Sequence, residues 1–284
     1  MQINCISFCE LLHLFTEDDN HNSKLLSVAT ESAGFDKTER LYVGSNFCSR
    51  YFLKFIEGVL KGISKLSEVK NGALKITLCV PVFSQLYLFD AKKLITSILN
   101  TYDCIDEVTV NDFGMLEFAK QLNNVKINVG RMMNKDARDI RYDGYFNLSH
   151  KPEVFTLENS ALKNYNVNVY EFDVTNRYVD FLGVNENFAV YYPYVFATVG
   201  SICEYAGVSL PIEKKFRANY HCAYDCVRFI NYYHNEFNDE YAKIGKTSYF
   251  INSNFVIKAD KPYRMVFEPF DAFLPKELKK WAKF

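Results

Sequence analysis

Strand-like and helix-like segments alternate through the middle of the 284-residue chain, and this alternation restricts the fold more than any other feature. Short runs of apolar and β-branched residues lie at 41–44, 74–80, 107–112 and 126–130. After the first two, apolar residues recur at helical spacing: Phe52, Phe55, Ile56, Val59, Leu60 and Ile63, then Leu88, Ala91, Leu94, Ile95, Ile98 and Leu99. A third helix is predicted from Phe113 to about Leu122. A strand and a helix that repeat at about 30 residues indicate βαβ units around a parallel sheet.

The C-terminal third of the chain is less regular. Strand-like segments lie at 167–173 and 187–192, but those at 247–257 and 263–268 follow one another without a helix between them. No linker rich in proline, glycine or serine interrupts the chain, so we expect a single domain over 1–284. We predict an α/β fold of the TIM type, a (βα) barrel that is either complete or incomplete and distorted. A doubly wound open sheet is the alternative.

Composition and charge exclude several classes of protein. Hydrophobic residues make up 49% of the chain and the net charge is −1, which is typical of a globular protein and argues mildly against a tight RNA binder. No apolar run reaches the roughly 20 residues that cross a membrane. The apolar segment 1–15 lacks the basic start and the cleavage site of a signal peptide. We therefore expect a cytoplasmic protein, in which the eight cysteines are reduced thiols, metal ligands or catalysts rather than disulfides.

In parallel α/β folds the functional site lies at the carboxyl ends of the strands. The residues that follow the predicted strands include 46–50, Asn111 with Asp112, 131–141, and Cys203. Cys48 and Cys203 are far apart in sequence, yet we predict that they share one face of the barrel.

Four of the cysteines have a simple structural interpretation. Cys79 lies within a predicted strand and Cys104 precedes one, so both are expected to pack as small apolar side chains. Cys5, Cys9 and His13 repeat every four residues and could line one face of a helix as metal ligands. Because apolar residues surround them and no fourth ligand is evident, apolar packing is the preferred interpretation.

Cys222 and Cys226 are different, because they lie in a polar and aromatic segment that follows a charged stretch. Four residues apart on a helical turn, their sulfurs could bind one metal ion or cluster, and thiolates favour zinc or iron–sulfur clusters. Such a pair alone is a weak signal. Cys48 and Cys203 would complete a set of four thiolates at the predicted loop face. His221 could instead act as a base beside Cys222, but adjacent side chains point in different directions.

Several stretches are similar in order and spacing to those of a known family. They are SNFCSR at 45–50, VNDFGMLEFAKQL at 110–122, INVGRMMNKDARDIR at 127–141 and YYPYVFATVGSIC at 191–203. They resemble successive blocks of the collagenase-like peptidases, the peptidase family U-32, over about 40–268. In layout the chain is most similar to short-chain members of the family, which are accessory proteins of oxygen-independent ubiquinone biosynthesis.

The resemblance implies a [4Fe–4S] cluster, with zinc as the alternative metal. The implied ligands are Cys48, Cys203, Cys222 and Cys226. It further implies a part in the oxygen-independent hydroxylation of a quinone precursor or an RNA base, a small carboxylate or aromatic substrate, and a related family member as heterodimer partner. Whether the chain is itself an enzyme stays open. A peptidase is less expected because the sequence has no HExxH or G-x-S-x-G motif and no local cysteine–histidine signature, and a non-catalytic scaffold is the third hypothesis.

Three residues are the expected substrate-binding positions: Asn111, Asp112 and Arg131. Arg131 follows the glycine that ends a predicted strand and could pair with a carboxylate, as could Arg138 and Arg141. The alternative for the latter two is a solvated loop with salt bridges to Asp136, Asp139 and Asp143. For Asn111 and Asp112 the alternative is a cap on the helix that begins at Phe113. His150 and His221 could act as acid or base, but isolated histidines are more often only hydrogen-bonded.

Overall fold

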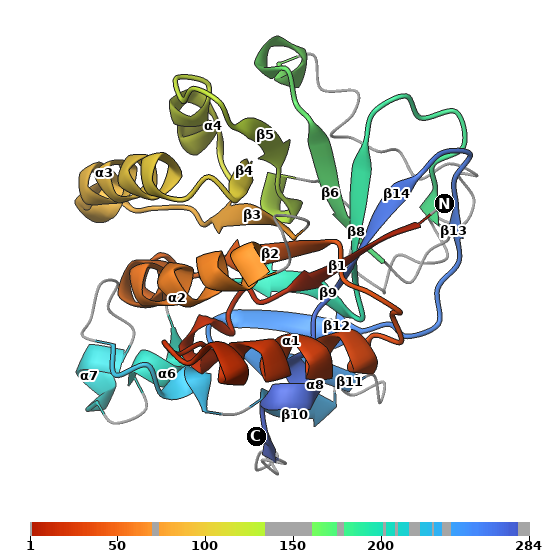
Figure 1. Cartoon of the computed structure of the whole chain (residues 1–284). Helices are drawn as coiled ribbons and strands as arrows, with labels where there is room; N and C mark the ends of the chain where they lie inside the picture. Colours follow the sequence, from red (N-terminus) through yellow and green to blue (C-terminus); the bar gives the residue numbers. More distant parts are fainter. Residues whose placement is uncertain are drawn as a thin grey trace.

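Eight parallel strands close into a barrel (Figure 1). The computed structural model describes residues 2–69, 74–133, 161–174, 179–200, 203–207, 210–215, 222–228, 230–234 and 240–277. The strands are β1 (Gln2–Ser7), β2 (Arg40–Gly44), β3 (Lys75–Val80), β4 (Ile105–Val110), β5 (Lys126–Val129), β6 (Val169–Asp173), β8 (Phe188–Tyr192) and β14 (Tyr263–Phe267). β14 pairs in parallel with both β1 and β8 and so completes the circle. The predicted TIM-like barrel is confirmed.

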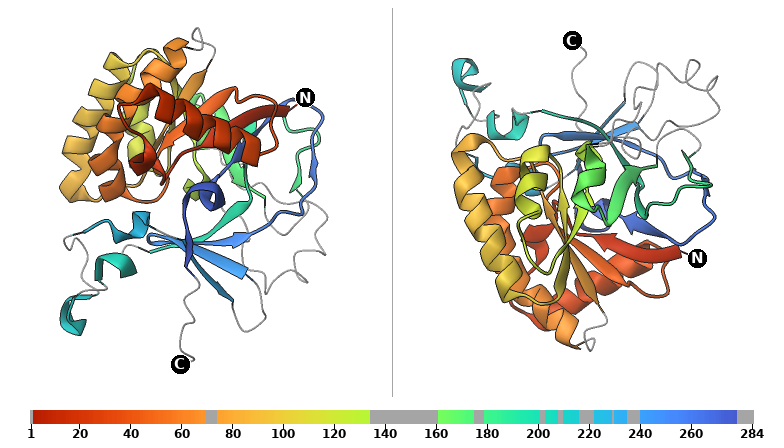
Figure 2. Two further views of the ribbon diagram at one scale, coloured as in Figure 1. Left: turned by 60° about the horizontal axis from the view of Figure 1, so that its bottom comes forward. Right: turned by 90° about the horizontal axis from the view of Figure 1, so that it is seen from above.

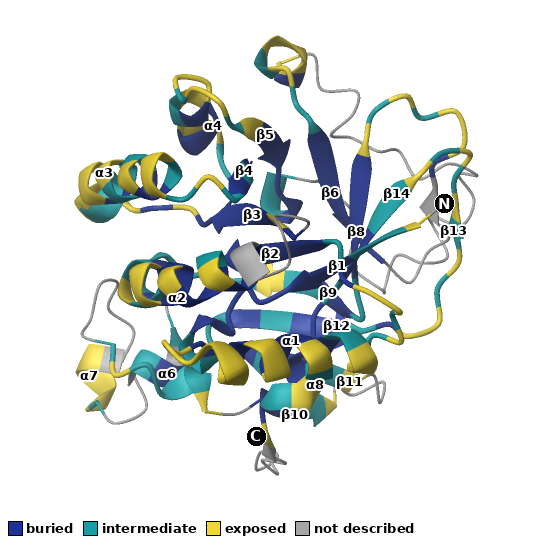
Figure 3. Ribbon diagram, in the orientation of Figure 1, coloured by how far each residue is buried: buried dark blue, intermediate teal, exposed yellow. Residues whose placement is uncertain are grey.

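Helices follow β1 to β4 and cover that side of the barrel (Figure 2), and the periodicity of the sequence predicts the last three of them. They are α1 (Asp19–Ser32), α2 (Ser49–Val69), α3 (Gln85–Thr101) and α4 (Phe113–Ala119). Each turns an apolar side towards the strands and a polar side outwards, so that burial follows the helical period (Figures 2 and 3). No helix within the described ranges is long and apolar enough to span a membrane.

The N-terminal segment is a strand, and the interpretation of Cys5, Cys9 and His13 as one helical face is wrong. Cys5 lies in β1, Cys9 lies in the turn after it, and His13 lies in η1 (Leu12–Leu14). Cys5 and Cys9 are fully buried and pack with Tyr42, Cys79 and side chains from other barrel strands, which meet only inside the barrel. Burial raises the pKa of Cys5 to about 12. The preferred interpretation, apolar packing, is confirmed for both cysteines.

The C-terminal third adds a second sheet, which agrees with its predicted irregularity. Its order is β15 (Lys276–Glu277), β10 (Ile230–His234), β11 (Glu240–Ile244), β12 (Thr247–Ile251) and β9 (Tyr194–Val199). β7 (Val179–Asp180) and β13 (Ile257–Lys258) form a separate pair. Aromatic rings join the second sheet to the barrel loops: the ring centroids of Phe47 and Phe196 are 4.8 Å apart, and those of Phe47 and Tyr249 are 5.8 Å apart. A short helix, α8 (Phe270–Phe273), follows β14 and packs against Tyr194.

The barrel interior is polar as well as apolar. Glu107 of β4 accepts hydrogen bonds from both terminal nitrogens of Arg264, at 2.7 and 2.8 Å, and lies 3.3 Å from a nitrogen of Arg40. Thr77 and Asn128 also donate to it. Burial alone would raise the pKa of Glu107, but Arg264 and Arg40 lower it to about 2. One buried carboxylate therefore links β2, β3, β4, β5 and β14.

Glu171 also lies inside the barrel, and its contribution to the free energy of unfolding is expected to depend on pH. Burial raises its pKa from 4.5 to about 7, although hydrogen bonds from Thr109 and Tyr191 act in the opposite direction. Between these two values the folded protein binds a proton that the unfolded chain releases, so this contribution to stability falls as pH rises. We expect the unfolding free energy of the wild type, measured relative to Glu171→Gln, to fall by on the order of 3 kcal/mol from pH 4.5 to pH 7.

Urea denaturation of both proteins across this pH range measures the difference. Glu57→Gln, a matched change on the exposed side of α2, serves as the control and is expected to show no such trend. A wild-type curve parallel to that of Glu171→Gln at every pH would contradict the prediction.

Candidate functional site

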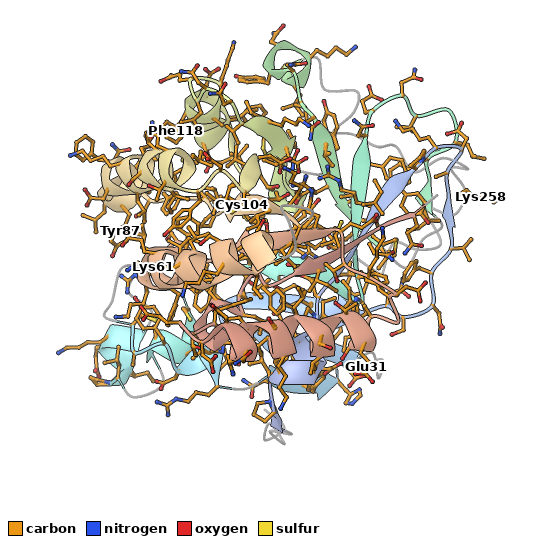
Figure 4. All side chains as sticks on the ribbon, viewed as in Figure 1. Glu31, Lys61, Tyr87, Cys104, Phe118 and Lys258 are labelled. Carbon is orange, nitrogen blue, oxygen red and sulfur yellow. The ribbon has the colours of Figure 1, made fainter. Side chains whose placement is uncertain are left out.

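A cavity of about 430 Å³ lies at the carboxyl ends of the barrel strands, between the barrel loops and the second sheet. Residues that follow β1, β2, β3 and β5 line it from the barrel side, and the second sheet contributes Val199, Gly200 and 244–247. Tyr87 lies near the start of α3 and is part of the cavity wall (Figure 4). The short helices α6 (Glu204–Gly207) and α7 (Ile212–Lys215) project from the same side of the molecule (Figure 1). The cavity is therefore at the face that parallel α/β folds use for binding and catalysis.

The cavity brings together thiols from distant parts of the sequence. The cysteines that line it are Cys48, Cys203, Cys222 and Cys226. Cys48 lies in the loop between β2 and α2, where its backbone N–H donates to Ser45 Oγ at 2.8 Å. Cys203 directly precedes α6, and Cys226 lies in η5 (Asp225–Val227). The cysteines that the sequence suggests as a set thus share one cavity, including Cys48 and Cys203.

The thiols of the cavity influence the pKa values of one another. Burial raises the pKa of Cys226, and negative charge on Cys203, Cys48 and Cys222 would raise it further. Burial also raises the pKa of Cys48 and of Cys222, and Cys203 acts on both in the same direction. Two cations oppose this effect: Lys246 lowers the pKa of Cys48, and Arg50 lowers that of Cys222. Both cations line the cavity.

A single metal ion would require the thiols of the cavity to lie close together. Within the part of the chain that the structure describes, no three His, Cys, Asp or Glu side chains are close enough to hold one metal ion. Around one zinc ion, four bonds of about 2.3 Å bring the sulfurs to within about 3.8 Å of one another. The chemistry of the donors suits soft metals, because thiolates favour zinc and iron–sulfur clusters, and two cations, Arg50 and Lys246, line the same cavity.

Arg131 is fully buried, and its guanidinium binds groups of the protein itself. One nitrogen donates to Glu268 Oε1 at 2.6 Å, and the other donates to Asp173 and to the carbonyl of Tyr194. The guanidinium also lies 4.3 Å from the centroid of the Tyr191 ring. A substrate carboxylate would have to displace these partners to reach Arg131. In this arrangement the arginine ties η2 (Arg131–Met133) to β6, to β9 and to the residue after β14.

Asn111 and Asp112 hold neighbouring loops in place. Asn111 is buried; its side-chain amide donates to the carbonyl of Val80 at 3.0 Å, and its oxygen accepts from the N–H of Met132 at 3.2 Å. Asp112 accepts from the N–H of Met115 at 2.7 Å and so caps α4. The capping alternative is confirmed for Asp112, and a substrate-binding role for either residue stays a prediction.

The remaining candidates are outside the described residues. These are Arg138 and Arg141, with Asp136, Asp139 and Asp143, and the two histidines His150 and His221.

Glu10 lines the cavity, although the sequence did not single it out. Its Oε1 accepts hydrogen bonds from Ser45 Oγ at 2.6 Å, from the N–H of Asn46 at 3.0 Å and from the N–H of Phe47 at 3.4 Å. Burial raises its pKa to about 6, while Ser45, Arg131 and the two N–H groups limit the shift. The side chain is therefore largely ionised at neutral pH. The one available signal was an acidic residue within the apolar stretch CISFCELLHLF.

His13 contacts the turn that carries Cys226. Its Nδ1 lies 2.8 Å from the hydroxyl of Tyr51, which also accepts from the backbone N–H of His13 at 3.1 Å. Burial lowers the pKa of His13 to about 4, against the effect of a hydrogen bond to the backbone of Val227. A neutral imidazole thus connects η1, α2 and the turn that carries Cys226.

No family model, curated protein or solved structure matches the chain, and its function is therefore inferred from its residues and their geometry.

Proposed function

We propose that the thiols of the cavity hold a [4Fe–4S] cluster and that the protein takes part in an oxygen-independent hydroxylation. The proposed ligands are Cys48, Cys203, Cys222 and Cys226. One observation carries the proposal: thiols from three separate parts of the chain line a single cavity at the carboxyl ends of the barrel strands. A purely packing role would not require cysteines from such distant segments to meet at one open site.

The surroundings of the thiols also support a cluster. Arg50 and Lys246 lie beside them and would offset part of the negative charge of thiolate ligands. When bound, a cluster with four protein ligands supplies electron transfer or structural support rather than substrate binding at iron. Hydroxylation of a quinone precursor or an RNA base, with a related subunit as partner, is carried over from the resemblance to the U-32 family.

Metal analysis of protein purified without oxygen tests the proposal. We expect a brown preparation with about four irons and about four sulfides per chain, and a paramagnetic signal after reduction. A colourless preparation with stoichiometric zinc would identify a zinc site instead. A folded protein without either metal would leave the scaffold hypothesis.

A peptidase is the second candidate, and the described residues offer little support for it. His13 is neutral, and its ring is hydrogen-bonded to the hydroxyl of Tyr51 and to the backbone of Val227 rather than to a cysteine thiol. Cleavage of a protein substrate by metal-free protein, abolished by one point mutation, would favour the peptidase over the cluster.

A further inference from the structure

Tyr224 lies midway between Cys222 and Cys226, in a segment that we call the cysteine turn (222–226). Its φ of 59° and ψ of 30° are left-handed, a conformation that residues with large side chains adopt rarely and that is often found at functional sites. Burial raises the pKa of Cys222, and a hydrogen bond from the backbone of Tyr224 to this thiol acts in the opposite direction. Tyr224 therefore sets the path of the chain between the two cysteines.

The ring of Tyr224 packs against α2. Its centroid lies 5.5 Å from that of Phe55, and the two ring planes meet at 80°, the edge-to-face arrangement that aromatic pairs favour. The Phe55 ring in turn lies 4.8 Å from the ring of Tyr51 and 6.2 Å from that of His13, measured between centroids. The contact with Phe55 thus joins the cysteine turn to an aromatic cluster formed by His13, Tyr51 and Phe55.

α2 is also next to a third cysteine of the cavity. The helix begins at Ser49, directly after Cys48, and Tyr51 and Phe55 are four residues apart on it, so they share one side of the helix. Burial raises the pKa of Cys48, and a hydrogen bond from the backbone of Tyr51 acts against this effect. One helix therefore contacts Cys48 through its first turn and the cysteine turn through Phe55.

We propose that Phe55 and Tyr224 are positioning residues, which hold the cysteine turn against α2 and so keep its two thiols at the cavity that Cys48 and Cys203 line. The inference rests on the proposed function in treating these thiols as cluster ligands. The ring contact supplies no ligand atom. Its effect is that a segment already held in its bound conformation loses less conformational entropy when the ligand binds.

Two variants remove the ring contact in different ways. Phe55→Ala removes the partner on α2 and leaves the cysteine turn unchanged. Tyr224→Asn removes the ring from the turn, and asparagine tolerates the left-handed conformation. Tyr224→Phe keeps the ring and is expected to behave as the wild type. Phe118→Ala is the matched control, because it removes a partly buried ring from α4 that is not part of the cavity wall (Figure 4).

Two measurements on protein purified without oxygen test the proposal. Iron analysis is expected to show a loss of about fourfold or more in Phe55→Ala and Tyr224→Asn, because the thiols of the turn are no longer held in place. On iron-free protein, peptide mass spectrometry follows the alkylation of Cys226 by iodoacetamide. We expect a rate about tenfold higher in both variants, because a released turn exposes a thiol that is now partly buried. The rate at Cys104 in the same samples is expected to stay unchanged.

Faster alkylation together with loss of iron supports the inference, and either change without the other, or neither, overturns it. The same losses in Tyr224→Phe or Phe118→Ala would also overturn it, because the ring contact would then not be the cause. Circular dichroism checks that the variants are folded, and Tyr224→Asn decides alone if Phe55→Ala does not fold. A wild type without iron would defeat the proposed cluster, and the alkylation rates would then decide this inference. Iron in the wild type with unchanged variants would defeat this inference alone.

Discussion

Replacing Cys226 by serine is expected to lower the iron content from about four per chain to near zero. Cys226 lines the cavity together with the other three cysteines, and negative charge on each of them would raise its pKa. Serine offers a hard oxygen that is protonated at neutral pH, and iron–sulfur clusters favour soft thiolates. Iron and sulfide analysis with the visible absorption spectrum measures the loss.

Cys104→Ser is the matched control. Cys104 directly precedes β4, at the opposite end of the strand from the cavity, and it is only partly buried (Figure 4). Its replacement is expected to leave the iron content unchanged. Cys48→Ser is the most informative companion variant, because Cys48 comes from the first third of the chain. A variant at Cys48 that keeps all of its iron would show that the ligand set is different.

Glu107→Gln is expected to lower the free energy of unfolding by about 3–5 kcal/mol, because it leaves buried cations without their anionic partner. Arg264 donates two hydrogen bonds to this carboxylate, and Arg40 lies 3.3 Å from it. An amide has the same shape but no charge, and its NH₂ group would face the donors of an arginine. Urea denaturation at pH 7 measures the loss.

The effect of Glu107 also has a characteristic pH dependence. Its pKa is lowered to about 2 in the folded protein from an ordinary value of 4.5. Its contribution to stability is therefore present above pH 4.5 and is lost as pH falls towards 2, so wild type and Glu107→Gln are expected to converge in acid. Asp106→Asn is the control: Asp106 also pairs with Arg40, but it is more exposed, and a loss of about 1 kcal/mol or less is expected. A loss that small in Glu107→Gln would contradict the prediction.

Local sequence patterns predicted most strands of the barrel but missed the first strand, β1. The apolar period of α2 and the β-branched strands β3 and β4 are visible in the sequence because each element buries one side against the same core. β1 was missed because its inward residue Cys5 and the later Cys9 are four residues apart, which also fits a helix. Only the pairing of β1 with β2 and β14 distinguishes the two conformations.

The site was predicted in part. The position of Cys48 and Cys203 at the carboxyl ends of the strands follows from the direction of a parallel sheet. The partners of Arg131 did not follow from any local pattern, since Asp173 and Glu268 are 42 and 137 residues away. Glu10 was missed because its significance comes from three donors in the loop after β2 and from the cavity beside it.

The sequence by itself determined the parallel α/β class, the positions of most barrel elements and the cysteines that suggest a metal site, because hydrophobic periodicity and the alternation of strands with helices can be seen locally along the chain. Only the tertiary structure decided which carboxylates pair with Arg131 and which oxygen of Glu10 accepts the hydrogen bonds of the loop after β2. The physical reason is that these properties depend on burial and on distances between residues from separate strands. Such distances are defined only when β14 closes the barrel between β1 and β8.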